Sequence, residues 1–205
     1  MSRPPEPLLR PRSIDDLRPT QITVGLREVE RKRAQWRKRA EGEGPEFLGR
    51  HMLPVVIGPK KRAHLIDNHH LALALHMEGV EHVLVQIVAD LGHLTRRAFL
   101  TFMDNRNWLH PFDAKGVRRD YDDIPARVAD LADDPYRSLA GALRRAGGYA
   151  KVDTPYAEFL WADFLRHRVK AARVKRHFDK AVADALALAK DKASDHLPGW
   201  VGPGG

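Results

Sequence analysis

Hydrophobic residues follow two different patterns along this chain, one in each half. In the first half they form short, nearly uninterrupted runs, and the runs at 54–57, 63–66 and 82–90 predict buried β-strands. The first two runs flank residues 58–61, whose Gly-Pro-Lys-Lys sequence predicts a hairpin turn. Residues 69–78, between the second and third runs, predict a helix.

From residue 93 onward, apolar residues recur every three to four positions, which is typical of amphipathic helices. The helices that this spacing predicts span 94–106, 124–132, 135–146, 155–167 and 168–190. The predicted fold class is therefore α+β, with a small mixed-sheet core followed by a mainly helical C-terminal region.

Four segments are expected from this organisation. They are a disordered tail over 1–13, an α+β core over 14–92, a helical region over 93–192 and a flexible tail over 193–205. Prolines crowd the first segment, and Leu197-Pro198-Gly199 lies in the last.

The polar segment between the strand at 63–66 and the next helix is the first candidate for chemistry. Asp67, Asn68, His69 and His70 stand at the helix start, where backbone N–H groups lack intrahelical partners and lie at the positive end of the helix dipole. Such a corner can hold a phosphate. The alternative is that Asp67 or Asn68 caps the helix and the histidines face water.

Composition narrows the function classes. The 205-residue chain has no cysteine, which excludes disulfides, thiol catalysis and metal sites built on cysteine. No apolar run is long enough to cross a membrane, and the N-terminus lacks the apolar region of a secretory signal. We therefore expect a cytoplasmic protein with no membrane partner.

Positive charge is concentrated in two stretches. The formal net charge is +8, and the excess lies in 27–39 and 166–180. Basic helices predict an anionic partner, which could be a nucleic acid, a nucleotide or an acidic protein. The expected nucleic-acid contacts are Arg173, Lys175 and Arg176. The alternative is a pair of solvated helix faces.

Five motifs occur in an order that resembles a known superfamily. They are Leu17-Arg18-Pro19-Thr20-Gln21, Pro54-Val55-Val56-Ile57-Gly58 and Leu65-Ile66-Asp67-Asn68-His69-His70, followed by the helical stretches 134–145 and 158–164. This set resembles the ParB/sulfiredoxin superfamily, and more narrowly the branch described as "putative ParB-like nuclease", over most of residues 14–168. The resemblance implies an α+β core whose strand–helix corner binds nucleotide phosphates.

The corner matches one form of the superfamily motif, Asp-Gly-His-His-Arg, with two departures. Asp67, His69 and His70 match, whereas Asn68 stands where glycine is usual and Leu71 stands where arginine is usual. Asparagine tolerates a left-handed backbone better than most residues, so the turn is expected to survive.

The loss of the arginine removes a bidentate phosphate donor. The candidates to supply replacement charge at the phosphate are Lys60, Lys61 or Arg62, on the preceding hairpin turn.

The resemblance also implies catalytic roles. Free-serine kinases of this superfamily use an acidic residue of the first helix as a base, and ParB proteins hydrolyse a nucleotide while clamping DNA. Glu28 is the expected base, ahead of Glu30, with His69 and His70 at the transferred phosphate. Both glutamates could instead only balance the arginines around them. A nucleotide carrying Mg²⁺ is the expected cofactor, with no dedicated metal site.

Three function classes follow. The first is a nucleotide-dependent phosphotransferase or hydrolase, and the second is a ParB-like nuclease or partition-type DNA protein. The third is a non-catalytic DNA-binding or protein-interaction module on the same fold. The sequence leaves the nucleotide, the acceptor and the oligomeric state open.

Overall fold

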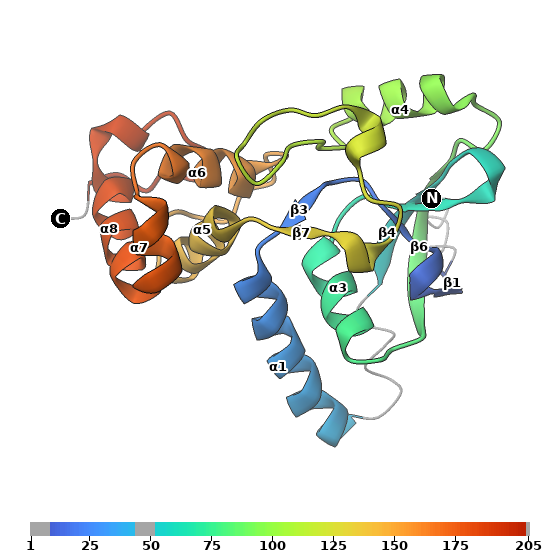
Figure 1. The fold of residues 1–205 in the computed structure, drawn as a ribbon, viewed down its shortest axis with the longest axis horizontal. Coiled ribbons are helices and arrows are strands. Elements are labelled where there is room, and N and C mark those ends of the chain that lie inside the picture. The colour runs from blue at the N-terminus through green and yellow to red at the C-terminus, as the bar shows by residue number, and fades with distance from the viewer. Residues whose placement is uncertain (1–8, 44–51, 204–205) are drawn as a thin grey trace, which may run out of the picture. The chain divides into compact units, whose positions relative to one another are not determined.

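The computed structural model describes residues 9–43 and 52–203 (Figure 1). The chain divides into two compact units that are interleaved along the sequence. The sheet unit comprises Met1–Ile22, Val29–Phe112 and Arg118–Ala132, and the helical unit comprises Thr23–Glu28, Asp113–Val117 and Asp133–Gly205.

A five-stranded mixed sheet is the framework of the sheet unit. Its strands, in spatial order, are β1 (Leu9–Ser13), β6 (His82–Asp90), β4 (Leu53–Ile57), β5 (Ala63–Leu65) and β2 (Arg18–Pro19). β4 pairs antiparallel with β5 and parallel with β6, while β2 runs parallel to β5 and β1 antiparallel to β6. The predicted α+β class with a mixed sheet is confirmed.

The three predicted strands of the first half are present as β4, β5 and β6. The turn between β4 and β5 contains the short helix η2 (Pro59–Lys61), and the helix between β5 and β6 is α3 (His69–Met77). Each run of β-branched and aliphatic residues supplies the interior of the sheet, and β6 matches the predicted range at both ends.

Strand β1 differs from the prediction. Residues 9–13, expected in a disordered tail, pair with β6 in a register that runs from Leu9 opposite Gln86 to Ser13 opposite His82. The proline-rich composition concealed the strand, because an edge strand tolerates Pro11 where a central strand would need its N–H. The rest of the predicted tail, residues 1–8, lies outside the described residues.

Helices cover both faces of this sheet. Val56 lies opposite His64 in the β4–β5 register, and these two side chains share the face that α4 (Arg96–Asn105) covers with Phe99 and Met103. Side chains alternate along a strand, so the buried Val55 and Leu65 point to the other face. Helix α3 lies on that other side (Figure 1).

The helical unit contains α5 (Pro135–Arg145), α6 (Ala157–Arg166), α7 (Ala171–Arg176) and α8 (Phe178–Lys190). Leu139, Leu143 and Trp161 are among its fully buried side chains. Asp134 caps α5 by accepting the N–H of Tyr136 at 2.9 Å, and its carboxylate also pairs with Arg166 at 2.7 Å. The helix α1 (Leu26–Glu43) begins among residues of this unit and continues in the sheet unit.

Two helices predicted in the second half are wrong or broken. The helix predicted over 124–132 is replaced by the single turn η4 (Val128–Asp130) and by β7 (Ala132–Asp133), which pairs with β3 (Thr23–Val24). Pro125 removes a backbone donor, and Arg127 is extended, with φ −134° and ψ 150°. The helix predicted over 168–190 is interrupted at His177, which has φ −138° and ψ 59°.

The C-terminal residues also differ from the flexible tail predicted over 193–205. The turn η5 (Lys192–Ser194) is followed by the buried Leu197. Trp161 Nε1 donates to the Pro198 carbonyl at 2.8 Å, and the Ala150 N–H donates to the Gly199 carbonyl at 2.7 Å. The segment up to Trp200 is therefore part of the helical unit, held by contacts that its Pro-Gly composition did not suggest.

In the part of the chain that the structure describes, no helix combines the length and the apolar character needed to cross a membrane.

Candidate functional site

The strand–helix corner, Asp67 to His70, contains a left-handed turn at the start of α3. Asn68 is the N-cap of α3 and is left-handed, with φ 63° and ψ 27°. Its side chain makes no capping hydrogen bond to the helix, and the Asp67 carboxylate instead accepts the Asn68 N–H at 2.6 Å. The left-handed turn expected at Asn68 is confirmed, whereas side-chain capping by Asn68, left open by the sequence, is not observed.

His69 is a buried anchor. Only 4% of it is exposed, and its Nε2 accepts the backbone N–H of Thr20 at 3.1 Å. Because Nε2 is an acceptor, the ring is neutral and its proton is on Nδ1. Thr20 in turn donates its hydroxyl to the Leu65 carbonyl at 2.7 Å, so His69 ties the start of α3 to the segment after β2.

The other members of the corner are more accessible. Asp67 is exposed and His70 is partly buried, so both can approach a ligand. Leu71, which stands where the superfamily often has arginine, is 7% exposed and belongs to the apolar core. A guanidinium at that position would have to leave water, which explains why this chain carries an apolar residue there.

Lys60 and Lys61 lie at the opposite end of β5 from Asp67, in η2. Both are exposed and have positive φ, 59° and 55°. Lys60 lines a cavity rather than the start of α3.

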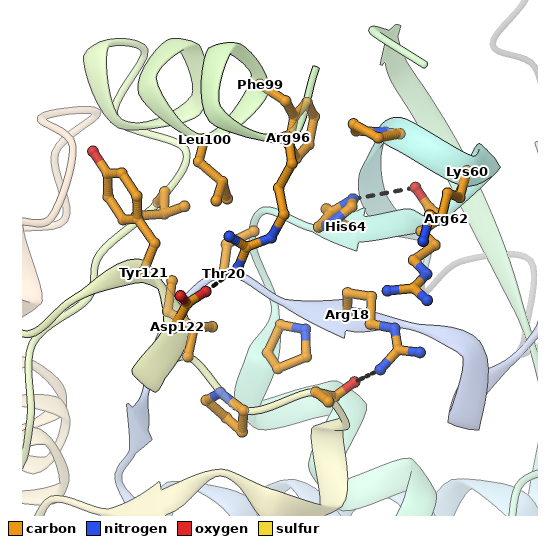
Figure 2. Close-up of a pocket in the computed structure, with 16 residues that line it drawn as sticks. Arg18, Thr20, Lys60, Arg62, His64, Arg96, Phe99, Leu100, Tyr121 and Asp122 are labelled. Atoms are coloured by element: carbon orange, nitrogen blue, oxygen red, sulfur yellow. Dashed lines mark hydrogen bonds and ion pairs between the residues drawn. The ribbon is translucent and has the colours of Figure 1, made fainter. Parts of the chain in front are cut away.

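A cavity of about 340 Å³ lies in the sheet unit (Figure 2). It lies on the α4 face of the sheet, and we call it the basic cavity. Its charged and polar lining includes Arg18, Thr20, Lys60, Arg62, His64, Arg96 and Asp122. Its apolar lining includes Phe99, Leu100 and Tyr121.

The charged groups of the basic cavity are only partly paired. Arg96 forms an ion pair with Asp122, and a terminal nitrogen of Arg18 donates to the Ala126 carbonyl. The Arg18 Nε is buried and has no hydrogen-bond partner among the described residues.

His64 is a neutral member of the cavity wall. Its ring lies 4.6 Å from the Phe99 ring, and its Nδ1 is 3.1 Å from the Arg62 carbonyl, to which it donates. Burial lowers the pKa of His64 to about 4, so the positive charge of the cavity comes from arginine and lysine.

Glu28, the expected base, is in the helical unit. It is buried, and both of its carboxylate oxygens accept from the guanidinium of Arg145. Gly141 permits this position, because a Cβ there would lie 2.8 Å from Glu28 Cδ. Glu30, the other acidic candidate, pairs with Arg33 at 2.7 Å, as expected if it balances a neighbouring arginine.

The predicted nucleic-acid contacts lie on α7. Arg173, Lys175 and Arg176 are all exposed, while Val174 between them is buried. Arg173 pairs with Asp184 at 2.7 Å, so part of its charge is compensated within the helical unit.

In residues 9–43 and 52–203, no three His, Asp or Glu side chains are grouped as a metal site would require.

The sequence interpretation missed the basic cavity. Its lining comes from segments as far apart as Arg18 and Ala126, and no motif joins them. One signal was available: His64 alternates with two apolar residues in a predicted strand, which directs it away from the core that they form.

Comparison with known proteins places the chain. The model of a family described as "Putative ParB-like nuclease" matches residues 11–167. The crystal structure of protein Atu1540 from Agrobacterium tumefaciens is 57% identical and has a TM-score of 0.90, over 96% of this chain and 98% of that one. Among curated proteins, none matches. The chain therefore belongs to the family described as putative ParB-like nucleases.

Proposed function

We propose that the β5–α3 corner binds a phosphate group of a nucleotide or nucleic acid, and that the protein carries out phosphoryl transfer or hydrolysis of a phosphate ester. The observation that carries the proposal is the left-handed Asn68 at the start of a nine-residue helix, without side-chain capping by that residue. A helix start of this kind presents backbone donors and the positive end of the dipole to an anion.

Each residue of the corner has a different proposed role. Asn68 sets the turn, His69 fixes it to Thr20, and His70 is the side chain proposed to contact the phosphate. Asp67 holds the Asn68 N–H and is exposed at the rim of the corner. Lys60 and Lys61 lie at the other end of β5, and this proposal does not use them.

Binding is tested by thermal unfolding of the full chain with ATP, ADP, CTP and GTP, each with and without Mg²⁺. A ligand bound only by the native state raises the unfolding midpoint. We expect one nucleotide to raise it in the parent protein, and His70→Ala to lose most of that rise. His82→Ala, an exposed histidine on β6, is the matched control and should keep it. Equal shifts in the parent and in His70→Ala would refute the assignment of His70.

Chemistry is tested separately with Glu28→Gln. This substitution keeps the size of the side chain and removes its charge and its ability to accept a proton as a base. Because both oxygens of Glu28 accept from Arg145, we expect phosphate release from the bound nucleotide to persist, and a fall of roughly two to four orders of magnitude would instead identify Glu28 as a general base. Turnover equal to that of the parent would remove Glu28 from the mechanism.

A second function, a non-catalytic DNA-binding or interaction module, is favoured by one observation. The position where the superfamily often carries arginine is filled by the buried Leu71, so the corner lacks that phosphate donor. In this alternative, the exposed Lys175 and Arg176 contact the phosphate backbone of DNA.

This alternative predicts duplex binding that weakens steeply with salt, together with no nucleotide turnover. Lys175→Glu with Arg176→Glu should weaken binding across all sequences and flatten the salt dependence. The reversal Lys190→Glu, at the end of α8, is the control for a change in charge elsewhere in the helical unit. Binding that ignores both salt and the double reversal would exclude the alternative.

A further inference from the structure

We infer that the basic cavity is a second binding site, for a small organic anion that carries a planar ring. It is separate from the corner, because it lies on the α4 face of the sheet beside β2 and η2. The inference does not depend on the function proposed for the corner.

The size of the cavity suits a small molecule. Its volume is about 340 Å³, at the lower end of the range of roughly 300–1,000 Å³ for ligand pockets. Its wall combines one basic side with one apolar side, so a ligand with separate charged and apolar parts would match it (Figure 2).

The charge of the lining selects an anion. Arg18, Lys60 and Arg62 contribute three positive charges in addition to the Arg96–Asp122 pair. Asp122 is the single carboxylate among the residues that line the cavity. His64 adds no charge near neutral pH, because its ring is buried and neutral.

The Arg18 side chain has a hydrogen-bond donor left for an anion. A terminal nitrogen of its guanidinium donates to the Ala126 carbonyl, whereas its buried Nε has no partner among the described residues. A buried N–H without an acceptor is unfavourable, and a guanidinium presents its donors as a planar fork. A carboxylate or phosphate oxygen would supply the acceptor that this nitrogen lacks.

The apolar side selects a ring. Phe99 and Tyr121 are aromatic, and Leu100 lies between them along the α4 side of the cavity (Figure 2). Gly58 keeps this wall in place, because a Cβ there would lie 2.7 Å from both Phe99 Cζ and His64 Cε1. The space beside these rings fits another flat, apolar group.

The test measures binding of three probes to the full chain by calorimetry. Phenyl phosphate and benzoate each carry a ring and an anion, and benzyl alcohol carries the ring alone. We expect at least one of the two anions to bind and benzyl alcohol to bind much more weakly or not at all. Comparing the phosphate with the carboxylate identifies which headgroup the cavity prefers.

Variants locate the binding. Arg62→Ala removes a lining cation and should weaken binding of the preferred anion roughly tenfold, as expected for loss of a charge-assisted contact. Arg97→Ala is the control, because Arg97 is an exposed arginine on α4 that does not line the cavity. Leu100→Trp fills the cavity without changing its charge, and should abolish binding.

Three results would overturn the inference. The first is that neither anion binds, and the second is that Leu100→Trp binds like the parent, which would indicate attraction to surface charge. The third is loss of binding in His70→Ala with Arg62→Ala unaffected, which would place the anion at the corner. Anion binding at the basic cavity and nucleotide binding at the corner are measured separately, so either proposal can fail while the other holds.

Discussion

Strand β5 connects the two candidate sites, and they are built in opposite ways. The corner consists of four consecutive residues, Asp67 to His70, at the end of the strand, and the anion binding proposed for it relies mainly on the backbone at the start of α3. The basic cavity gathers arginines and a lysine from three segments between Arg18 and Arg96, and the anion binding proposed for it relies on side chains.

This difference decides what each site depends on. The corner needs one left-handed residue and one buried histidine, so it is a local structure fastened to the rest of the unit through Thr20. The basic cavity exists only when β2 pairs with β5 and α4 packs on the sheet. Substitutions at the two sites should therefore have separable effects on stability and on binding.

The largest effect on stability is expected from loss of the hydrogen bond between His69 and the Thr20 N–H. His69→Ala leaves the Thr20 N–H without its acceptor and opens a cavity at a position that is 4% exposed. We expect a loss of about 2–4 kcal/mol in the free energy of unfolding. Urea denaturation of the variant against the parent measures it.

His70→Ala is the control for this prediction, because it truncates the adjacent, partly exposed histidine. It should change stability by well under 1 kcal/mol. Equal losses in the two variants would mean that His69 is not the anchor, and the contrast between a fastened and an accessible histidine would be lost.

The next largest effect is a pH-dependent change in stability caused by His64 in the wall of the basic cavity. Burial lowers the pKa of His64 to about 4, below the ordinary value of 6.5. The unfolded state therefore binds a proton more readily, and this group destabilises the fold as the pH falls from 6.5 towards 4. As the pH falls from 6.5 to 4, the free energy of unfolding of the parent should decrease by up to roughly 3 kcal/mol relative to that of His64→Gln.

Denaturation at a series of pH values checks the sign as well as the size. The Glu78 carboxylate titrates in a lower window, because its hydrogen bonds with Arg37 and Arg33 hold its pKa at about 2. Its contribution is lost only as the pH falls below about 4.5, so it does not mimic the His64 effect. The prediction would be contradicted if the free energy of unfolding changed with pH in the same way in the parent and in His64→Gln.

The sequence predicted the elements that depend on local pattern. β4, β6 and α3 follow from runs of β-branched residues and from helical spacing, and their predicted ranges match the structure closely. The helix expected over 124–132 was wrong, because Arg127 is extended and β7 is determined by its pairing with β3. Pairing between distant segments leaves little trace in local periodicity.

The same limit applies to the sites. The left-handed turn at Asn68 could be predicted, since asparagine substitutes for glycine there with little strain. That His69 is buried against Thr20 could not, because residues 20 and 69 meet only in the folded unit. Nor could the sequence predict that Glu28 is paired with Arg145, which follows it by more than one hundred positions.

Gly58→Ala tests whether the cavity wall can be disturbed without the corner. The added Cβ would lie 2.7 Å from two rings, of which Phe99 is in the core and gives way only by displacing its neighbours. We expect a cost of about 1–3 kcal/mol, typical of overpacking. In the same variant, nucleotide binding at the corner should equal that of the parent, and a loss there would show that the two sites are coupled.

The smallest effect is expected from substitutions of Asn68 that change only how easily the backbone of the corner adopts its left-handed turn. Asn68→Ala places a residue without a local hydrogen-bonding side chain at φ 63°, which should cost about 1 kcal/mol, whereas Asn68→Gly adopts this conformation without strain. If the corner binds phosphate through its backbone, Asn68→Gly should bind as the parent does and Asn68→Ala should bind more weakly. Anion binding at the basic cavity should be unchanged in both variants. If glycine also abolished nucleotide binding, the asparagine side chain would be the binding group, and the contrast between a backbone site and a side-chain site would no longer hold.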